Sequence, residues 1–309
     1  KRMRELFNVN LSDAEFPISR QELLSAVKEA DILVPTIGDK IDASILSAAS
    51  SNLKLIANYG AGYDHIDIKT ALQRGIIVTN TPSVLTTDTA DMTMALILAI
   101  PRKLREGHEE MQSGNWRGWS PSAMIGMRIT GKKLGILGMG RIGQAIAKRA
   151  KAFDLDINYH NRRRLHRNIE ESLSAKYWEN LEEMLSAIDI LVVSASLNPS
   201  SLYLLSAKCL GKMKHTAYLV NISRGEIIDQ KALVRQLKDG KLGGAGLDVY
   251  DSEEIIGSDF KSLKNVFLLP HMGSSTLEGR IEMGEKVIIN IKTFIDGHRP
   301  PDQIVPSMI

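Results

Sequence analysis

Short apolar runs alternate with longer amphipathic stretches along most of the chain. The first of these runs are LFNVNL (6–11), DILVPT (31–36), LKLIANYG (53–60) and IIVTN (76–80), and helical patterns lie between them. Apolar runs of this length between helical segments are typical of parallel strands that helices cover on both faces. The first part of the chain is therefore predicted to have an α/β fold, with a strand at each of these runs.

A second series of strands and helices begins with GKKLGILGMG (131–140). Further apolar runs follow it, each separated from the next by a helical pattern. Parallel strands with intervening helices predict a doubly wound sheet. The strands expected in this sheet are 133–137, 155–160, 189–195, 217–222, 243–249 and 265–270.

Three helical patterns stand out beside these strands. Ser19 followed by Glu22 is a capping-box pattern that opens a helix. A long helix is expected over about 83–113, with a kink at Pro101, and it is long enough to link two domains. The final helix, over about 277–296, has no strand after it, so we expect it to return to the first domain.

The predicted organisation is α/β, with two doubly wound parallel-sheet domains. One domain comprises residues 1–92 and 285–309, and the other comprises residues 93–284. A chain of 309 residues is too long for one simple core, and its length is typical of a protein with two domains.

Composition and charge narrow the class of protein. Apolar residues make up 43% and charged residues 24%, and the net charge of +3 is too small for a chain built to coat nucleic acid. Cys209 is the single cysteine, so no internal disulfide is possible and a reducing compartment fits. The longest apolar run, 94–100, is far short of the roughly 20 residues of a membrane helix. We expect a cytoplasmic protein, and a natural N-terminus trimmed before Lys1.

The segment GILGMGRIGQAIAKRA (135–150) contains a G-x-G-x-x-G pattern at Gly138, Gly140 and Gly143. The pattern follows an apolar strand and opens a helix, which is the context that makes it specific for a dinucleotide. The first glycine permits a tight turn, the second lets the backbone approach a pyrophosphate, and the third lets helix and strand pack closely. The helix N-terminus offers N–H groups and a positive dipole to the phosphates.

The loop after the next strand bears on cofactor choice. In such sites an acidic residue about 20 positions on binds the ribose 2′-hydroxyl. Here the strand ends at His160, and Asn161, Arg162 and Arg163 follow. Without a carboxylate, and with two guanidinium groups, the loop predicts NADP(H) over NAD(H). The alternative is that the arginines, like the remaining basic residues of 158–167, are only a solvated loop.

Candidate catalytic residues follow three late strands: Arg224 in NISRGEIID, Glu253 in GLDVYDSEE and His271 in LLPHMGSS. Ligands of open α/β sheets bind outside the carboxyl ends of the strands. A histidine can protonate a carbonyl oxygen as hydride arrives, a carboxylate can support that histidine, and an arginine can hold a substrate carboxylate. Each residue also has an ordinary alternative: a structural salt bridge, a solvated acidic loop beside Glu254, or a packing residue.

These segments carry a family resemblance. The chain resembles the D-isomer-specific 2-hydroxyacid dehydrogenases, of the glyoxylate/hydroxypyruvate reductase branch, over nearly its whole length. The resemblance implies a Rossmann cofactor domain, a flavodoxin-like substrate domain and an active site in the cleft between them. It implies reduction of glyoxylate or hydroxypyruvate with NADPH. The matching segments are NYGAGYDHID (58–67), GMGRIG (138–143), NISRGEIID (221–229), AGLDVYDSEE (245–254) and PHMGS (270–274).

The resemblance also implies residue roles. Arg224, Glu253 and His271 fall on the family's catalytic arginine, glutamate and histidine. Backbone amides at Ala61 and Gly62 would grip the substrate carboxylate, beside Arg224 and His271. The implied cofactor contacts are Gly138, Gly140, Arg141, Ile142, Gly143, Asn161, Arg162, Arg163, Ser196, Ile222, Ser223, Arg224, Asp248, His271 and Gly273.

The chain departs from the family's pattern at two places, and the resemblance also implies a partner subunit. Glu254 stands where the family has proline after its catalytic glutamate, and SASLNP (194–199) lacks the histidine common in NAD-using relatives. The resemblance implies a homodimer joined through the cofactor domain, with Trp119 as the candidate that reaches the neighbour's active site; core packing is its alternative. No clustered ligand spacing is present, so we predict no metal.

Two other functions remain open from the sequence. One is a dinucleotide-sensing corepressor-like binding protein of the same fold, which would retain the site residues. The other is an NAD-linked relative that acts on a different 2-hydroxy acid. The absence of a carboxylate at position 161, where Asn161 stands, argues against this alternative. Steady-state turnover of glyoxylate with NADPH separates the first of these from a reductase.

Overall fold

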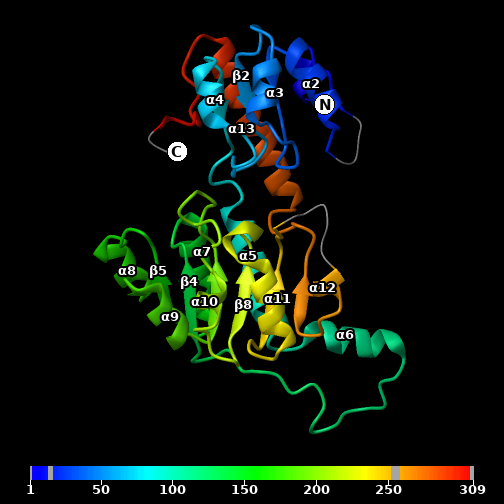
Figure 1. Ribbon diagram of the computed structural model, residues 1–309, viewed down its shortest axis with the longest axis vertical. Helices are drawn as coiled ribbons and strands as arrows, with labels where there is room; N and C mark the ends of the chain where they lie inside the picture. Colours follow the sequence, from blue (N-terminus) through cyan, green and yellow to red (C-terminus); the bar gives the residue numbers. More distant parts are fainter. Residues whose placement is uncertain (1, 13–16, 252–257, 307–309) are drawn as a thin grey trace. The chain divides into compact units, whose positions relative to one another are not determined.

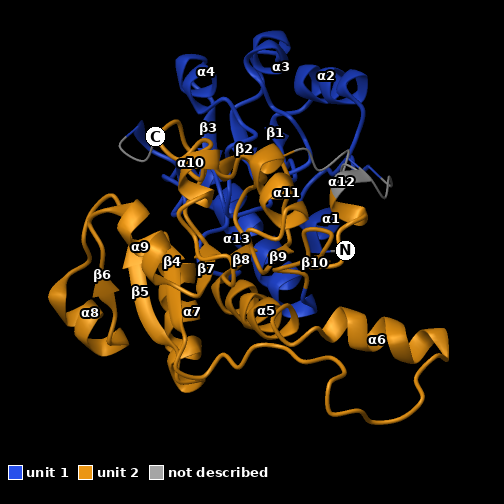
Figure 2. Cartoon of the chain, turned by 60° about the horizontal axis from the view of Figure 1, so that its bottom comes forward, with its two compact units in different colours: residues 1–85, 276–309 blue, residues 86–275 orange. Residues whose placement is uncertain are grey.

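A computed structural model describes residues 2–12, 17–251 and 258–306 (Figure 1). The chain divides into two compact units, coloured separately in Figure 2. Unit 1 comprises Lys1–Leu85 and Thr276–Ile309, and unit 2 comprises Thr86–Ser275. Helix α13 (Leu277–Ile295) belongs to unit 1, so that unit is assembled from the two ends of the chain.

Unit 1 contains a parallel sheet of three strands, β1 (Ile32–Leu33), β2 (Leu55–Ala57) and β3 (Ile77–Thr79), in the order β1-β2-β3. Its helices are α1 (Arg2–Leu6), α2 (Arg20–Glu29), α3 (Ala43–Ala48), α4 (Ile68–Gln73) and α13. The predicted capping box at the start of α2 is confirmed. The side chain of Ser19 accepts a hydrogen bond from the backbone N–H of Glu22, and the side chain of Glu22 accepts one from the backbone N–H of Ser19.

The strand expected over 6–11 is wrong. The chain is helical over Arg2–Leu6, and the residues that follow belong to no strand. Leu6 and Leu11 are exposed, whereas Phe7 packs against the small core cluster that includes Val287 and Ile291 of α13. A strand needs a partner with which to share a hydrogen-bond ladder, and periodicity alone does not supply one.

Unit 2 contains a parallel sheet of seven strands, in the order β10-β9-β8-β7-β4-β5-β6. The chain moves outward from β4 to β6 and then returns to β7 beside β4, which is the strand order of a Rossmann-type fold. Six strands lie within the predicted runs: β4 (Lys133–Leu137), β5 (Asp156–His160), β7 (Ile190–Val193), β8 (Tyr218–Asn221), β9 (Gly244–Leu247) and β10 (Val266–Leu268). The sequence missed β6 (Lys176–Tyr177), an edge strand too short to show a period.

Apolar side chains lie on both faces of the unit 2 sheet, as the sequence predicted. Along β7, Ile190 and Val192 contribute to one core, while Leu191 and Val193 contribute to the other. The first core is closed by α5 (Thr86–Ala99) and α7 (Arg141–Ala152), and the second by α9 (Leu181–Ala187), α10 (Ala207–Leu210) and α11 (Gln230–Lys238). The remaining helices are α6 (Leu104–Ser113), α8 (Arg167–Leu173), η1 (Gly225–Ile227) and α12 (Ser258–Lys261).

The single kinked helix expected over 83–113 is wrong. The chain forms α5 and α6 as separate helices, with a turn at Pro101 and Lys103. Lys103 adopts a left-handed conformation (φ 55°), so the break ends one helix and redirects the next. Both helices belong to unit 2, and the boundary with unit 1 falls between Leu85 and Thr86, at the start of α5. Proline lacks an N–H to continue the helix, and tertiary packing decided between a kink and an end.

Candidate active site

The glycine-rich turn joins β4 to α7, and two of its glycines are required by the fold itself. Gly138 has a φ of 98°, and a Cβ there would lie 2.4 Å from the backbone nitrogen of Ala195. A Cβ on Gly143 would lie 2.3 Å from the carbonyl oxygen of Gly138. Gly140 is the N-cap of α7, and nothing lies within 4 Å of its Cβ position. The open space over Gly140 fits a backbone that a pyrophosphate approaches.

Asn161 occupies the position where the acidic residue of an NAD site would stand. Its side-chain oxygen accepts a hydrogen bond of 2.6 Å from the backbone N–H of Met139, inside the glycine-rich turn. The asparagine therefore ties the loop after β5 to the phosphate-binding turn. Sequence reasoning gave Asn161 only the negative role of lacking a charge, and did not foresee this bond.

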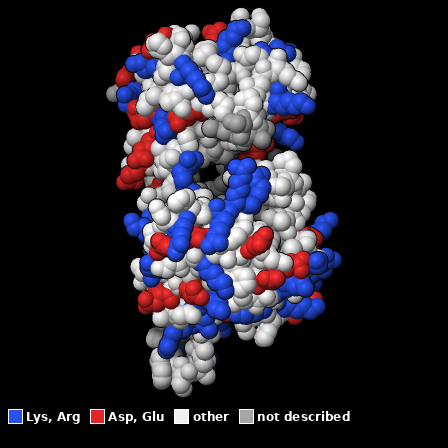
Figure 3. Space-filling model, turned by 90° about the vertical axis from the view of Figure 1, so that its left-hand side faces the viewer, with Lys and Arg blue, Asp and Glu red and all other residues white. Residues whose placement is uncertain are grey.

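Arg162 and Arg163 are exposed and make no hydrogen bond or ion pair with residues 2–12, 17–251 or 258–306. Figure 3 faces the side of unit 2 that carries α8 and shows Lys and Arg interspersed with Asp and Glu. The two arginines stand beside the glycine-rich turn, held there through Asn161.

Hydrogen bonds connect the loops at the carboxyl ends of neighbouring strands. Ser194, after β7, donates to the Gly138 carbonyl at 2.5 Å, and Ser223, after β8, donates to the Ala195 carbonyl. The backbone N–H of Asp248, after β9, donates to the Asn221 carbonyl at 2.9 Å. The predicted cofactor residues of unit 2 thus share one edge of the sheet, and these bonds fix their loops relative to one another.

Asp248 holds the segment after β10 and is itself 1% exposed. Its carboxylate accepts hydrogen bonds from the N–H groups of Met272 (2.8 Å) and Gly273 (2.7 Å). His271, just before them, has a φ of 52°, a left-handed conformation that histidine tolerates better than most residues. A non-glycine residue in this region is a mark of functional sites when its surroundings hold it there. Here the buried carboxylate of Asp248 does so.

Arg224 follows β8 and is half-buried, and its guanidinium donates to the Ser223 carbonyl at 2.7 Å. The side chain of Asn221 donates to the Arg224 carbonyl at 2.9 Å, which fixes the backbone at this position. Gly225 is required next to it, since a Cβ there would lie 1.9 Å from the carbonyl carbon of Tyr250. Glu253, the third predicted catalytic residue, lies outside the described residues.

The predicted substrate contacts Ala61 and Gly62 lie in unit 1, in the turn after β2. Their carbonyls accept hydrogen bonds from side-chain amides, Ala61 from Asn80 (2.7 Å) and Gly62 from Asn58 (2.8 Å). Asn58 also donates to the Gly60 carbonyl at 3.0 Å. Within the described part of the chain, the N–H groups of Ala61 and Gly62 have no acceptor. With its carbonyls held, this turn can offer its amides to an anion.

Sequence reasoning missed Asn58 and Asn80. Asn58 is fully buried, and its side-chain oxygen is 3.0 Å from Nε2 of His65. The signal in the sequence was an asparagine directly after each of the two paired strands, β2 and β3, but which carbonyls they hold depends on the turn geometry.

Trp119 is 85% exposed, so the packed-core alternative for it is excluded within this chain. Among the residues that the structure describes, no group of three or more His, Cys, Asp and Glu side chains could hold a metal ion. None of the described helices is long and apolar enough to cross a membrane.

A family model matches the segment that contains the glycine-rich turn and the loops after the later strands. The model for "D-isomer specific 2-hydroxyacid dehydrogenase, NAD binding domain" matches residues 94–273, which is more than half of the chain. The chain belongs to this family. The matched segment covers the glycine-rich turn, Arg224 and His271.

Relatives of known name agree over almost the full length. A glyoxylate reductase of Pyrococcus furiosus is 42% identical over 311 residues, covering 99% of this chain and 92% of that protein. The solved TT0316 protein of Thermus thermophilus is 40% identical, with a TM-score of 0.90 over 98% of this chain and 95% of that one. An NADPH-dependent glyoxylate/hydroxypyruvate reductase of Sinorhizobium meliloti, solved with NADP and malonate, is 33% identical, with a TM-score of 0.83 over 91% and 86%. The expected family branch and the α/β Rossmann-type fold are confirmed.

Proposed function

We propose that this D-2-hydroxyacid dehydrogenase reduces small 2-oxo acids, glyoxylate and hydroxypyruvate first, with NADPH as the preferred cofactor. The family supports a dinucleotide-dependent dehydrogenase, and relatives named as glyoxylate reductases support the substrate class. The observation that carries the cofactor preference is the pair of unpaired guanidinium groups at Arg162 and Arg163, beside a site that has Asn161 in place of an acid.

A 2-oxo acid presents a carboxylate and a neighbouring carbonyl. The amides of Ala61 and Gly62 bind the carboxylate, because their turn has its carbonyls held on the other side. The guanidinium of Arg224 anchors the substrate and polarises its carbonyl. When bound, the reduced nicotinamide supplies a hydride to the carbonyl carbon. His271 donates the proton to the carbonyl oxygen, and Glu253 supports the charged form of that histidine, as the family implies.

The cofactor preference has a direct electrostatic cause. A 2′-phosphate carries negative charge and several acceptor oxygens, so a carboxylate at position 161 would repel it, whereas asparagine does not. Arg162 and Arg163 supply charge-assisted hydrogen bonds, which are each worth about 1.5–3 kcal/mol. Binding through both arginines would favour NADPH over NADH by roughly 10²–10⁴-fold, since each 1.4 kcal/mol is tenfold.

Replacing His271 with asparagine tests the reaction. Asparagine also tolerates a left-handed backbone, so the substitution removes the proton donor without adding strain at φ 52°. We expect kcat for glyoxylate to fall by roughly 10²–10⁴-fold, with the Kd for NADPH unchanged. Near-normal turnover in this variant would overturn the assignment of His271.

Replacing both Arg162 and Arg163 with alanine tests the cofactor preference. We expect KM for NADPH to rise at least about 100-fold, because the charge-assisted hydrogen bonds of both arginines to the phosphate are lost. KM for NADH should change by less than about twofold. Equal effects on the two cofactors would refute the 2′-phosphate site and leave the dehydrogenase reaction standing.

We also propose a homodimer formed through unit 2. Helix α6 and the loop after it extend away from the sheet of unit 2 (Figure 1). The segment exposes an unusual number of large apolar side chains for a single chain, and such patches mark interfaces. They are Leu104, Met111, Trp116, Trp119, Met124 and Ile125. The single cysteine supports a cytoplasmic location for the dimer.

A further inference from the structure

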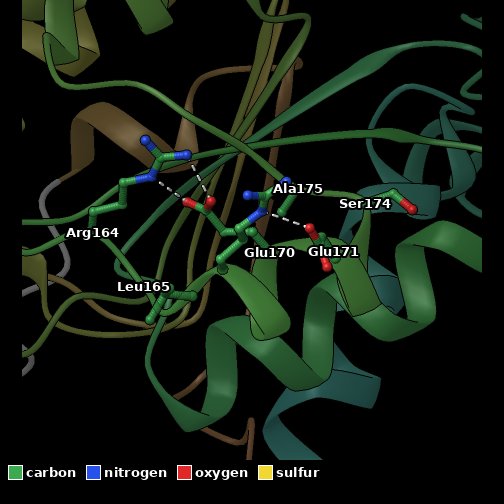
Figure 4. A pocket seen from close by; sticks show the side chains of 7 residues that line it. Arg164, Leu165, Glu170, Glu171, Ser174 and Ala175 are labelled. Carbon is green, nitrogen blue, oxygen red and sulfur yellow. Dashed lines mark hydrogen bonds and ion pairs between the residues drawn. The ribbon is translucent and has the colours of Figure 1, made fainter.

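Arg164, the third arginine of the basic run, was expected to be solvated like Arg167. The structure shows otherwise. The side chain of Arg164 forms two hydrogen bonds with Glu170 of α8, Nε to Oε1 at 2.9 Å and Nη2 to Oε2 at 2.8 Å (Figure 4). This two-point geometry is the strongest form of arginine–carboxylate contact. The guanidinium also lies over the ring of Tyr177, 5.5 Å from its centre.

Glu170 is an unusual partner, because its side chain is only 8% exposed while that of Arg164 is 64% exposed. The buried hydroxyl of Tyr159, in β5, donates to Oε1 of Glu170 at 2.6 Å. The same hydroxyl accepts the backbone N–H of Leu165 at 3.0 Å. Tyr159, Glu170 and Arg164 therefore form one connected network between the end of β5, the loop and α8.

Hydrogen bonds fasten both ends of a short loop, and the network supplies those at the second end. At the first end, the Asn161 side chain bonds to the glycine-rich turn at 2.6 Å. At the other end, Arg164 and Leu165 are bonded to Glu170 and Tyr159. Only the two residues between the fastened ends, Arg162 and Arg163, extend from the loop without a partner in the described part of the chain. Their range of positions is limited by the anchors on either side.

The groove between the loop and α8 does not form a second anion site. Its volume is about 680 Å³, and its arginines are committed to acids, Arg164 to Glu170 and Arg167 to Glu171 at 2.8 Å (Figure 4). Two donors of Arg164, Nε and Nη2, are already bonded to Glu170, so we do not assign Arg164 as a ligand of the phosphate. Its role is exerted through the loop that it closes.

We propose that the Tyr159–Glu170–Arg164 network is a positioning device for cofactor selection: it holds Arg162 and Arg163 in place to bind a 2′-phosphate. The inference rests on the proposed NADPH preference and adds which residues produce it. A loop that is already ordered loses less conformational entropy when it binds, so pre-organisation raises affinity without adding a contact. Glu170, an acid, therefore strengthens the binding of an anion.

The decisive variant is Glu170→Gln, because two hypotheses predict opposite results. If Arg164 were itself a phosphate ligand, removing the negative charge would free it and tighten binding of the anion. If the network positions the loop, the weakened bond to Arg164 loosens Arg162 and Arg163, and binding of the anion weakens. Glu171→Gln is the matched control, since it removes the same charge one residue along α8, from an exposed pair with Arg167.

The readout is binding of adenosine 2′,5′-bisphosphate and of 5′-AMP by calorimetry, together with KM for NADPH and NADH. We expect Glu170→Gln to weaken adenosine 2′,5′-bisphosphate and to raise KM for NADPH by about 3–10-fold, as for one hydrogen bond of about 1 kcal/mol. Binding of 5′-AMP, KM for NADH and kcat should stay within about twofold. Glu171→Gln should leave all five values unchanged.

Two results would overturn the inference. Unchanged or tighter binding of adenosine 2′,5′-bisphosphate in Glu170→Gln rejects the positioning role. Equal weakening of both nucleotides means that the network supports only the fold. Arg164→Met is the second variant, and it must weaken the bisphosphate selectively as well. Measured alongside, the Arg162→Ala, Arg163→Ala double variant separates the two claims, because the NADPH preference itself is rejected if this variant weakens adenosine 2′,5′-bisphosphate no more than it weakens 5′-AMP.

Discussion

The three glycines of the β4–α7 turn should separate by function when each is replaced with alanine. Gly143 is the informative one, because its Cβ would lie 2.3 Å from the Gly138 carbonyl oxygen and 3.1 Å from the Ser194 hydroxyl. An ordinary non-bonded contact is roughly 3.5 Å, so the backbone must move by about 1 Å. Forcing an extra carbon into a packed site costs about 1–3 kcal/mol. Gly143→Ala should destabilise the protein in the absence of any cofactor.

Gly140→Ala is the control within the same motif. Its φ of −77° suits any residue, and nothing lies within 4 Å of the added methyl group. Its stability should stay within about 1 kcal/mol of the parent, the scale of an N-cap change. The methyl group would occupy the space that the pyrophosphate needs, so dinucleotide affinity should fall at least about tenfold, or 1.4 kcal/mol.

The assay is thermal unfolding of the apo-protein beside a fluorescence titration with NADPH. We expect the unfolding midpoint of Gly143→Ala to fall by about 2–12 °C, at roughly 2–4 °C per kcal/mol for a unit of this size. The midpoint of Gly140→Ala should change little, while its affinity for NADPH falls. Equal destabilisation by the two variants, or a fully stable Gly143→Ala, would show that the packing argument is wrong.

Three further outcomes follow from the described contacts. The hydrogen bonds from Arg164, with that from the Tyr159 hydroxyl, lower the pKa of Glu170 to about 2, and such a group adds stability that is present above about pH 4.5 and lost as the pH falls towards 2. The unfolding midpoint of Arg164→Met should therefore lie below the parent's at pH 7 and approach it between pH 4.5 and 2; a constant difference would contradict this. Asn80→Ala frees a carbonyl of the substrate turn, so KM for glyoxylate should rise about 2–10-fold with KM for NADPH unchanged, and a similar effect of the exposed Asn52→Ala would remove the specific explanation. Trp119→Asp should weaken self-association at least about tenfold in sedimentation measurements, and a parent that sediments as a monomer would reject the proposed interface.

The order of strands and helices followed closely from the sequence. Each strand of the unit 2 sheet other than β6 lies within an apolar run, because a strand covered on both faces must be apolar at nearly every position. The glycine-rich turn was equally readable. Its requirements, a positive φ at Gly138 and a close approach at Gly143, are local properties of the residues concerned.

What the sequence misplaced was decided by partners distant along the chain. The alternation over 6–11 matched a strand, but these residues pair with none of the described strands, and Phe7 packed against the cluster that includes Val287 and Ile291 of α13 instead. Pro101 marked a disturbance in a helical pattern, and only packing set it as an end with a left-handed turn at Lys103. Local preference is weak next to tertiary contacts of this kind.

By itself the sequence determined the α/β class, the dinucleotide-binding turn and the family. It also determined that asparagine, and not an acidic residue, stands at position 161. Only the tertiary structure decided that Arg164 is committed to Glu170, while Arg162 and Arg163 are left without partners among the described residues. Three adjacent arginines are equivalent in a sequence. They become different because one faces a buried carboxylate that must be neutralised, and burial is a property of the folded chain alone.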